Sequence, residues 1–317
     1  MHGTGELIVM RAAFYERYGP PEVIQIRDLP KPTQKDGELL IKIIATTLHR
    51  GDTRMRSLSI PGSFVERFMG RLVLGYNAPK NKVLGMEVAG IVESVGKKVS
   101  RFKAGDKVFA STYRGFKFGG HAEYICLPET GIVGLKPSCM TYEEAAPVPA
   151  SGCAALIYLR ETGKIKAGDR VLINGASGAL GTYSVQIAKY FGAEVTGVCS
   201  TSNIEMVESL GADYVVDYTE EDFTKSGNKY DLIFDAVSLS SKSECQNILA
   251  PGGRYIRTTG RNPKLEDLLF LKGVIEAGKL MTVIDRRYSL DEIVEAHRYV
   301  EKGHKKGNVV INVSKGE

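Results

Sequence analysis

Several classes of protein are excluded by what this sequence lacks. It has no tryptophan, and its five cysteines lie at least 13 residues apart, so no pair has the close spacing of a zinc ribbon. We therefore expect no disulfide framework and a location in the reducing cytoplasm. No apolar run reaches the roughly 18 residues of a membrane span. The first ten residues lack the basic segment and apolar core of a signal peptide.

Charge of one sign is also scarce. The 42 basic and 37 acidic residues leave a formal net charge of +5, and no block of five like charges occurs. Nucleic-acid-binding proteins concentrate positive charge more strongly, so we expect no nucleic-acid partner. With 317 residues, 43% of them hydrophobic, the chain is long enough for two soluble globular domains.

The two parts of the chain differ in rhythm. Up to about residue 135, short β-branched runs such as 38–46, 88–96 and 106–112 are separated by glycine and proline, which predicts a β-rich barrel or sandwich. An alanine-rich helical connector follows, with Thr141 as N-cap and Glu144 closing a capping box.

Strands and helices then alternate to the end of the chain, which predicts a parallel sheet with helical crossovers and an α/β fold. The expected strands are 170–175, 194–200, 214–218, 230–237, 252–260 and 308–313, and the expected helices are 181–192, 203–211, 265–280 and 289–303. We therefore predict a first domain over 1–140, completed by 285–317, and a second over 141–284.

The strongest chemical signal is the segment NGASGALG at 174–181, which follows a predicted strand and opens a predicted helix. Ala176, Gly178 and Gly181 occupy the three positions of a dinucleotide-binding fingerprint, with alanine in the first. The helix N-terminus would hold the pyrophosphate. The predicted cofactor-binding residues here are Ala176, Ser177, Gly178, Ala179, Leu180 and Gly181.

The loop after the next strand, CSTSN at 199–203, bears on the choice of cofactor. An NAD site usually places an acid there to hold the ribose hydroxyls, but this loop offers Ser200, Ser202 and Asn203 instead. The absence of an acid favours NADPH. The loop also lacks arginine and lysine, so this signal is incomplete, and the same residues also suit a turn that caps the next helix.

The chain resembles the medium-chain dehydrogenase/reductase superfamily, in its zinc-independent quinone oxidoreductase branch. The match runs nearly end to end. The segments that carry it are 10–26, 45–57, LGMEVAGIVESVG at 84–96, 102–110, 119–129, 143–152, 174–181, LGADYVVDY at 210–218 and the tail GHKKGNVVINV at 303–313.

This resemblance implies a GroES-like module joined to a Rossmann domain, and hydride transfer from NADPH to an electron-poor C=C bond or a quinone. The small-molecule substrate would be a quinone or an enone. The likeness and the predicted topology add cofactor contacts at strand ends and in the tail, namely Tyr218, Ala236, Val237, Thr259, Gly260, Lys306 and Asn308.

Zinc is not expected. The zinc alcohol dehydrogenases of this superfamily carry a histidine ligand where this chain has Met86, and the ligand cysteine expected in 45–57 is missing. The segment 111–120 holds none of the four cysteines of the structural zinc loop. A catalytic zinc needs three protein ligands, and Cys153, His49 and Glu87 stand isolated in the sequence.

Without a metal, the site must stabilise an enolate or phenolate oxygen and supply a proton. The resemblance places His49, Asp52 and Arg56 along the cleft, and His49 is the candidate proton donor. A structural role for His49 stays open, as do solvent, Tyr76 and Tyr113 as proton sources.

The chain departs from the resemblance after Gly260. Typical relatives continue with a loop and an outer strand before the next helix, whereas here the helix follows roughly thirty residues early. Either the protein lacks this segment or the sequence omits it. The family often dimerises through that strand, so if the protein lacks it we expect a monomer or a dimer with another interface.

Two other functions remain in view. An enoyl-thioester reductase fits less well, because SIPGSF at 59–64 stands where such reductases carry a tyrosine. A non-catalytic NADPH-binding redox sensor or structural protein would keep the same glycines. NADPH consumption with a panel of quinones separates that alternative from an enzyme.

Overall fold

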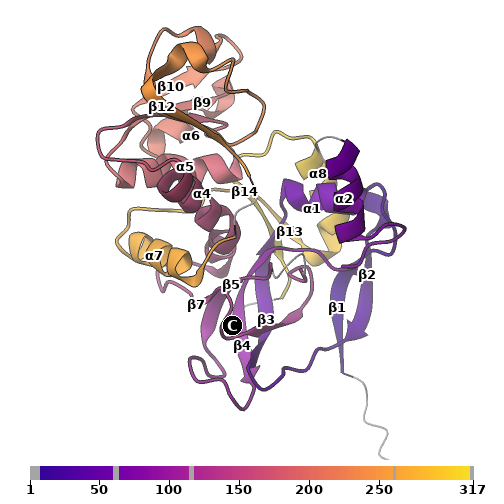
Figure 1. Ribbon diagram of the computed structural model, residues 1–317. Helices are drawn as coiled ribbons and strands as arrows, with labels where there is room; N and C mark the ends of the chain where they lie inside the picture. Colours follow the sequence, from indigo (N-terminus) through magenta and orange to yellow (C-terminus); the bar gives the residue numbers. More distant parts are fainter. Residues whose placement is uncertain (1–7, 60–63, 114–117, 260–261, 315–317) are drawn as a thin grey trace, which may run out of the picture. The chain divides into compact units, whose positions relative to one another are not determined.

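The computed structural model describes residues 8–59, 64–113, 118–259 and 262–314. Within these ranges, no helix has the length and apolar character needed to cross a membrane. Figure 1 labels most of the helices and strands and colours the chain from its N-terminus (indigo) to its C-terminus (yellow).

The chain divides into two compact units. The first unit comprises Met1–Pro149, Arg286–His304 and Val309–Glu317, and the second comprises Ala150–Asp285 and Lys305–Asn308. This division differs from the boundaries predicted from the sequence in the helical connector, at Asp285, which lies in the second unit, and in the tail. The start of the helical connector lies in the first unit, and four residues of the tail lie in the second.

The first unit is built on a seven-stranded sheet of order β13–β14–β3–β4–β5–β7, with β6 paired to β3. A separate β1–β2 pair and the helices α1, α2, α3 and α8 complete the unit. The elements are β1 Val9–Phe14, β2 Gln25–Pro30, β3 Glu38–Thr47, α1 Arg50–Ser57, α2 Phe64–Leu74, β4 Glu87–Val95, β5 Lys107–Ser111, β6 Tyr124–Pro128, β7 Val133–Leu135, α3 Tyr142–Ala145, β13 Ile284–Ser289, α8 Ile293–Glu301 and β14 Asn308–Asn312.

The central strand β3 positions the functional residues of this unit. Leu39, Ile41 and Ile43 alternate along it and are fully buried in a core shared with β4, β5 and β6. Where β3 ends at Thr47, the chain turns through His49 directly into α1. The pairing of β3 with β4 therefore brings residues 47–52 beside the start of β4.

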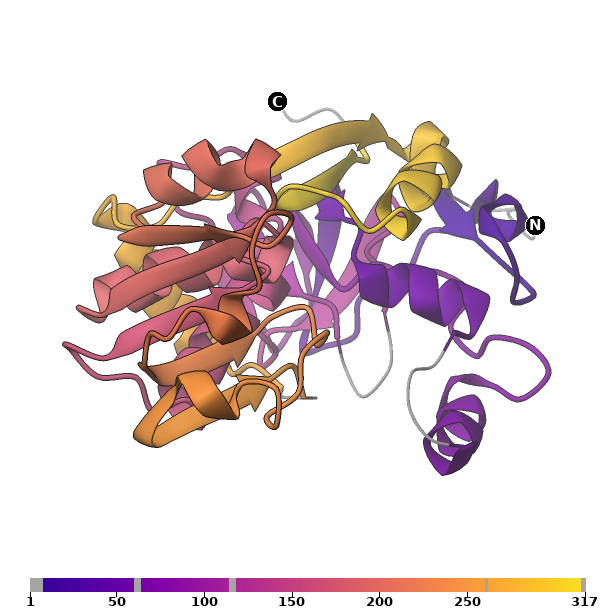
Figure 2. The same cartoon turned by 90° about the horizontal axis from the view of Figure 1, so that it is seen from above.

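The second unit holds a five-stranded parallel sheet of order β10–β9–β8–β11–β12, and Figure 2 shows these strands side by side. The order reverses between β8 and β11, which is where such sheets bind nucleotides. The elements are α4 Cys153–Ile157, β8 Arg170–Asn174, α5 Ala179–Tyr190, β9 Glu194–Cys199, α6 Ile204–Ser209, β10 Tyr214–Asp217, β11 Tyr230–Asp235, β12 Leu249–Arg257 and α7 Leu265–Glu276.

The helical connector is less regular than the sequence predicts. Thr141 and Glu144 form the expected capping box at the start of α3. The chain then passes through a π-helical turn before α4 and a second one after it. Pro147 and Pro149 explain the interruption, because proline offers no backbone N–H to continue a helix.

The outer edge of the parallel sheet ends at β12. The expected strand over 252–260 begins earlier, at Leu249, and a register shift opposite Tyr230 and Leu232 accommodates its early start. After β12 the described chain continues into α7, and no described strand pairs with the outer edge of β12. The helix that follows early after Gly260 in the sequence is therefore accompanied, in the described structure, by a parallel sheet that ends at its fifth strand, β12.

Candidate functional site

The glycine-rich turn after β8 has the backbone geometry of a nucleotide-binding loop. Gly175 adopts a φ of 79°, which favours glycine, and Gly178 caps α5 in an extended conformation. A Cβ on Gly181 would lie 2.1 Å from the Gly175 carbonyl oxygen, so only glycine fits where α5 meets the turn. Ala176 is buried, and its N–H donates to the Val198 carbonyl at 2.9 Å.

Gly178 has a different environment. A Cβ there would meet only the Gly175 carbonyl oxygen, at 3.5 Å, which is ordinary contact. The internal packing therefore does not require glycine at this position, whereas a phosphate approaching the backbone would. The first turn of α5, with Ala179 and Leu180, presents N–H groups that a helix cannot satisfy internally.

The tail of the chain returns to this turn. Gly307 donates its N–H to the Ser177 carbonyl at 2.8 Å and forms a bridge with Gly178. Gly307 has a φ of 62°, and a Cβ on it would lie 2.4 Å from the Val283 carbonyl oxygen. Asn308 is buried, and its side-chain oxygen has no hydrogen-bond partner among the described residues.

The tail also supplies the cation that the sequence of the CSTSN loop lacks. Lys306 Nζ donates to the Ser202 carbonyl at 3.0 Å. Within the loop, Asn203 Nδ2 donates to Ser200 Oγ at 2.9 Å, and the Asn203 side-chain oxygen is buried without a partner in the described chain. Lys305 instead donates to the Gly307 carbonyl.

The strand β10 brings an acid, Asp217, to the CSTSN loop. This acid was not predicted from the sequence. Asp217 ends β10 opposite Cys199, and Tyr218 donates its N–H to the Cys199 carbonyl at 3.0 Å. The hydrogen bond from Thr201, followed by that from Thr219, lowers the pKa of Asp217. Pairing of β9 with β10, and not distance along the chain, places this carboxylate here. The side chain of Tyr218 is exposed.

The ends of β8 and β11 are joined by a buried carboxylate. Asp235 accepts hydrogen bonds from Asn174 Nδ2 and from the N–H groups of Val237, Ser238 and Ser240. It thereby fixes the loop that contains Ala236 and Val237 beside the glycine-rich turn. Ala236 and Val237 were predicted from the sequence and Asp235 was not, although an acid at the end of an apolar strand was a visible signal.

The next strand end is only partly described. The Thr259 carbonyl accepts a hydrogen bond from the Tyr158 hydroxyl, and Thr258 pairs with Ser238 at 2.6 Å between their hydroxyl oxygens. The predicted contact Gly260 lies outside the described residues.

In the first unit, three polar side chains from two strands and a turn converge. His49 Nε2 lies 2.6 Å from Glu87 Oε1 and 2.9 Å from Thr47 Oγ1, and the Thr47 hydroxyl donates to Glu87 Oε1 at 2.6 Å. Glu87 is fully buried, whereas the His49 side chain keeps 16% exposure. A histidine paired with a buried carboxylate can hold a proton and present it to solvent or ligand.

Asp52 and Arg56, also predicted from the sequence, make internal contacts. Asp52 accepts from the N–H groups of His49 and Gly85, at 2.8 and 3.1 Å, so it fixes the start of α1. The Arg56 side chain is fully buried and pairs with Glu301, and burial lowers its pKa. Its Nε and Nη1 have no hydrogen-bond partner in the described chain. Of the three predicted residues His49, Asp52 and Arg56, only His49 is partly exposed.

Two further histidines are buried in the first unit. His121 Nε2 lies 2.9 Å from the Thr47 carbonyl oxygen, and its ring meets that of His297 edge to face, with the ring centres 6.4 Å apart. Burial lowers the pKa of both imidazoles, and that of His297 well below its ordinary value of 6.5. Both ring nitrogens of His297 lack a partner in the described chain.

The residues of the His49 pair do not form a metal centre in the described structure. No group of three or more His, Cys, Asp or Glu side chains in the described ranges is arranged to hold a metal ion. Met86 packs against α1, because its Cε lies 2.8 Å from where a Cβ on Gly51 would be.

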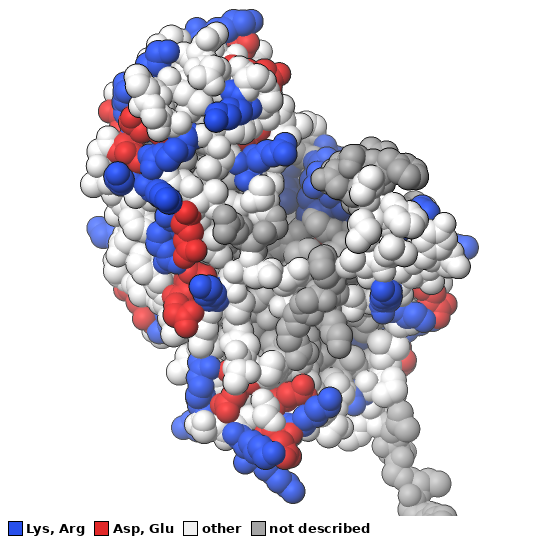
Figure 3. Space-filling view, in the orientation of Figure 1, with Lys and Arg blue, Asp and Glu red and all other residues white. Residues whose placement is uncertain are grey.

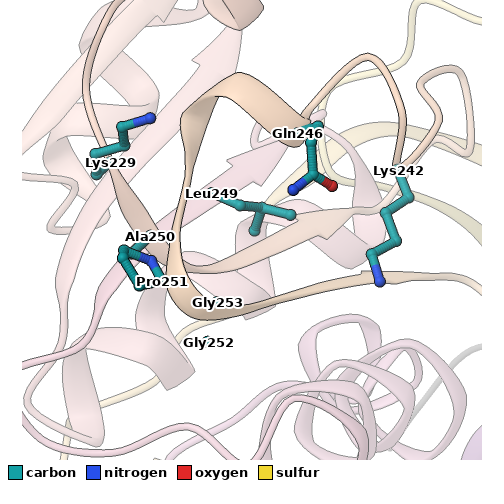
Figure 4. Close-up of a pocket in the computed structure, with 8 residues that line it drawn as sticks. All are labelled: Lys229, Lys242, Gln246, Leu249, Ala250, Pro251, Gly252 and Gly253. Atoms are coloured by element: carbon teal, nitrogen blue, oxygen red, sulfur yellow. The ribbon is translucent and has the colours of Figure 1, made fainter.

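A hollow of about 370 Å³ lies at the other end of the second unit's sheet. Figure 4 shows its residues at the beginning of β12, with Lys229 and Lys242 on opposite sides. In a parallel sheet, nucleotides bind beyond the carboxyl ends of the strands. This hollow is therefore not the nucleotide site.

Family comparisons agree with both units. An alcohol dehydrogenase GroES-like domain matches residues 35–138, and a zinc-binding dehydrogenase family matches residues 179–281, with a second model of that description at 261–311. The family description names zinc, but the described residues of this chain contain no group of three or more His, Cys, Asp or Glu side chains that could hold a metal ion.

Known proteins match the chain along nearly its whole length. The 2-methylene-furan-3-one reductase of Solanum lycopersicum is 32% identical, over 96% of this chain and 79% of that protein. The chloroplast envelope quinone oxidoreductase homolog of Arabidopsis thaliana is 31% identical, over 96% of this chain and 98% of that protein. Its alignment spans 337 residues, more than the 317 of this chain, so the relative contains residues that this chain lacks.

A solved structure supports the same fold. The quinone oxidoreductase from Coxiella burnetii superposes with a TM-score of 0.83 at 27% identity, covering 97% of this chain and all of that one. The chain thus belongs to the medium-chain dehydrogenase/reductase superfamily, in its quinone-oxidoreductase-like branch, and is an NAD(P)H-dependent oxidoreductase.

Proposed function

We propose that this protein is a zinc-independent reductase that uses NADPH to reduce quinones or α,β-unsaturated carbonyl compounds. The observation that carries the proposal is the cradle of the second unit, where Gly307 and Lys306 of the tail meet both the glycine-rich turn and the CSTSN loop. The NADPH-dependent alkenal/one oxidoreductase of Arabidopsis thaliana, 30% identical over 95% of this chain and 79% of that protein, supports the substrate class.

The residues of the second unit fit a nicotinamide dinucleotide. The open space at Gly178 and the N–H groups of α5 suit a pyrophosphate, and the buried oxygens of Asn203 and Asn308 lack partners in the described chain. The proposed cofactor-binding residues are Ala176, Ser177, Gly178, Ala179, Leu180, Gly181, Ser200, Ser202, Asn203, Tyr218, Ala236, Val237, Thr259, Gly260, Lys306 and Asn308.

A preference for NADPH rests on the balance of charge at the CSTSN loop. The hydroxyls of Ser200 and Ser202 can donate to a 2′-phosphate, and Lys306 supplies a positive charge beside them. The negative charge of Asp217 would repel a 2′-phosphate, although hydrogen bonds from Thr201 and Thr219 satisfy part of this carboxylate. We propose that the lysine outweighs this acid.

The first unit supplies the proton in this proposal. When bound, the nicotinamide provides a hydride, which adds to the β-carbon of an enone and leaves an enolate. His49 then donates its proton to the enolate oxygen or α-carbon, and the carboxylate of Glu87 stabilises the protonated imidazole before transfer. Asp52 and Arg56 act as positioning residues that hold α1 in place.

We propose that no zinc takes part. A methionine thioether is a weak ligand beside the histidine and thiolates that zinc prefers, so Met86 removes one of the three ligands that a catalytic site requires.

The test is NADPH oxidation by the purified protein with a panel of 2-alkenals, enones and quinones, before and after treatment with a chelator. We expect turnover with at least one class of acceptor, unchanged by the chelator, in protein without stoichiometric zinc. Turnover that is confined to alcohol oxidation, or that a chelator abolishes and zinc restores, would overturn the proposal. This test does not address the cytoplasmic location predicted from the sequence, which stays a prediction.

A further inference from the structure

Helix α2 exposes an apolar stripe that the proposed function does not use. Its hydrophobic residues recur at intervals of three and four, the pattern by which a helix normally faces a core. Here the pattern faces outward. The exposed fractions are 67% for Val65, 46% for Phe68, 52% for Met69, 45% for Leu72 and 37% for Val73.

The helix is anchored at its end, so the stripe belongs to the fold. The Tyr18 hydroxyl donates to the Gly75 carbonyl at 2.9 Å, and Lys80 donates from Nζ to the Leu72 carbonyl at 2.7 Å and from its backbone N–H to the Leu74 carbonyl at 2.9 Å. Gly75 has a φ of 123°, which turns the chain sharply after the helix.

The surroundings of the stripe are basic. Residues 64–82 contain four lysines and arginines and a single acid, Glu66. Arg71, Lys80 and Lys82 are exposed, and Tyr76, with 57% exposure, follows the stripe directly. At the place of α2 in Figure 1, the described atoms of the surface in Figure 3 are mostly white, that is, from residues other than Lys, Arg, Asp and Glu.

We infer that α2 docks the protein on the surface of an anionic lipid bilayer, with its axis along the interface. An 11-residue helix is about 16 Å long and cannot span a membrane, but an apolar face bordered by basic residues and an aromatic residue is typical of interfacial helices. The positive border favours anionic headgroups over a neutral apolar partner. This inference does not depend on the proposed reaction.

Two separate terms should contribute to the free energy of binding to lipid. Burying side chains such as Phe68 and Leu72 contributes a term that does not depend on salt, because apolar transfer is insensitive to screening. The basic residues contribute a term that weakens as salt is added. Binding should therefore depend both on anionic lipid and on the stripe.

The experiment is co-sedimentation of the full-length protein with phosphatidylcholine vesicles that contain or lack phosphatidylglycerol. We expect binding to the anionic vesicles that weakens with salt. The Phe68→Ser/Leu72→Ser double variant should lose at least tenfold in affinity. Leu239→Ser is the matched control, because Leu239 is 84% exposed but lies in the second unit.

A second variant tests the charge independently. Arg71→Glu should reduce binding to anionic vesicles at low salt and converge with the wild type at high salt. Circular dichroism melting checks that each variant folds. Absence of wild-type binding to anionic vesicles, or equal binding by the wild type and both variants, would overturn the inference. So would a concentration-dependent dimer that the double variant abolishes, since the stripe would then be a self-interface.

Discussion

The two candidate sites of this protein are built in different ways. The cradle of the second unit consists mainly of backbone. A Cβ on Gly181 or Gly307 would lie within 2.4 Å of a carbonyl oxygen, whereas a Cβ on Gly178 would make only an ordinary contact at 3.5 Å. The site of the first unit consists of side chains, and the Glu87 carboxylate is its centre. The difference indicates that substitutions in the second unit should affect cofactor binding, whereas substitutions in the first unit should affect turnover.

The largest expected effect is on turnover. His49→Gln should lower kcat for an enone by about 100- to 10,000-fold, since it removes a positioned proton donor. Glu87→Gln should lower kcat in the same direction, because it leaves His49 without its charged partner. The affinity for NADPH, measured by fluorescence titration, should not change in either variant.

His304→Gln is the matched control for a histidine substitution in the first unit, since His304 is exposed. It should keep the wild-type kcat. If His49→Gln also kept it, solvent or another residue would be the proton source, and the comparison between the two units would lose its catalytic half.

The glycine pair of the cradle should separate binding from stability. Gly181→Ala forces a Cβ to within 2.1 Å of the Gly175 carbonyl oxygen, so we expect a loss of about 1–3 kcal/mol in the free energy of unfolding. Gly178→Ala fits the free protein, so its unfolding should be unchanged while its affinity for NADPH falls at least tenfold. Urea unfolding and cofactor titration measure the two effects. Equal stability loss in both variants would contradict the distinction.

A smaller effect is expected on the choice of cofactor. A charge-assisted hydrogen bond contributes about 1.5–3 kcal/mol, so Lys306→Ala should reduce the ratio of kcat/KM for NADPH over NADH by about tenfold or more. Ser200→Asp should shift the ratio in the same direction, and Asp217→Asn should shift it the other way.

Lys279→Ala, which removes an exposed lysine elsewhere in the second unit, should leave the ratio unchanged at the same salt concentration. A wild type that uses NADH as well as NADPH, with a ratio unmoved by all these variants, would show that the loop does not read the 2′-phosphate.

The smallest effect concerns acid stability of the first unit. His121 and His297 have folded-state pKa values below their ordinary value of 6.5, because burial disfavours the charged imidazole. As the pH falls below about 6.5, the unfolded chain therefore binds protons first, and the free energy of unfolding decreases. His297→Leu should weaken this dependence. Urea unfolding at pH 7.5 and 5.5 measures it, and an unchanged slope in the variant would argue against a neutral buried His297.

The sequence predicted the second unit better than the first. The segment 174–181 is contiguous, so its turn, the strand before it and the helix after it could be read from neighbouring residues. The boundaries of β8, β9 and α5 lie within about two residues of those predicted. Lys306 lies 104 residues from Ser202, so it could be proposed as a partner only from the resemblance together with the predicted topology.

Side-chain partnerships escaped the sequence where they depend on strand pairing. Glu87 was considered only as an isolated metal ligand, yet β3 and β4 place it against His49. The acid-free loop at 199–203 gains Asp217 from β10. Asp52 and Arg56 were predicted to line the site together with His49, but their side chains are buried, which only the fold reveals.

The most direct test of the central claim is the position of a label in the product. The wild-type protein would be given an enone and NADPH that carries deuterium at C4 of the nicotinamide, in ordinary water. The account predicts a saturated ketone with deuterium at the carbon β to the carbonyl and a solvent-derived hydrogen at the α-carbon. Deuterium at the carbonyl carbon, in an alcohol product, would contradict it.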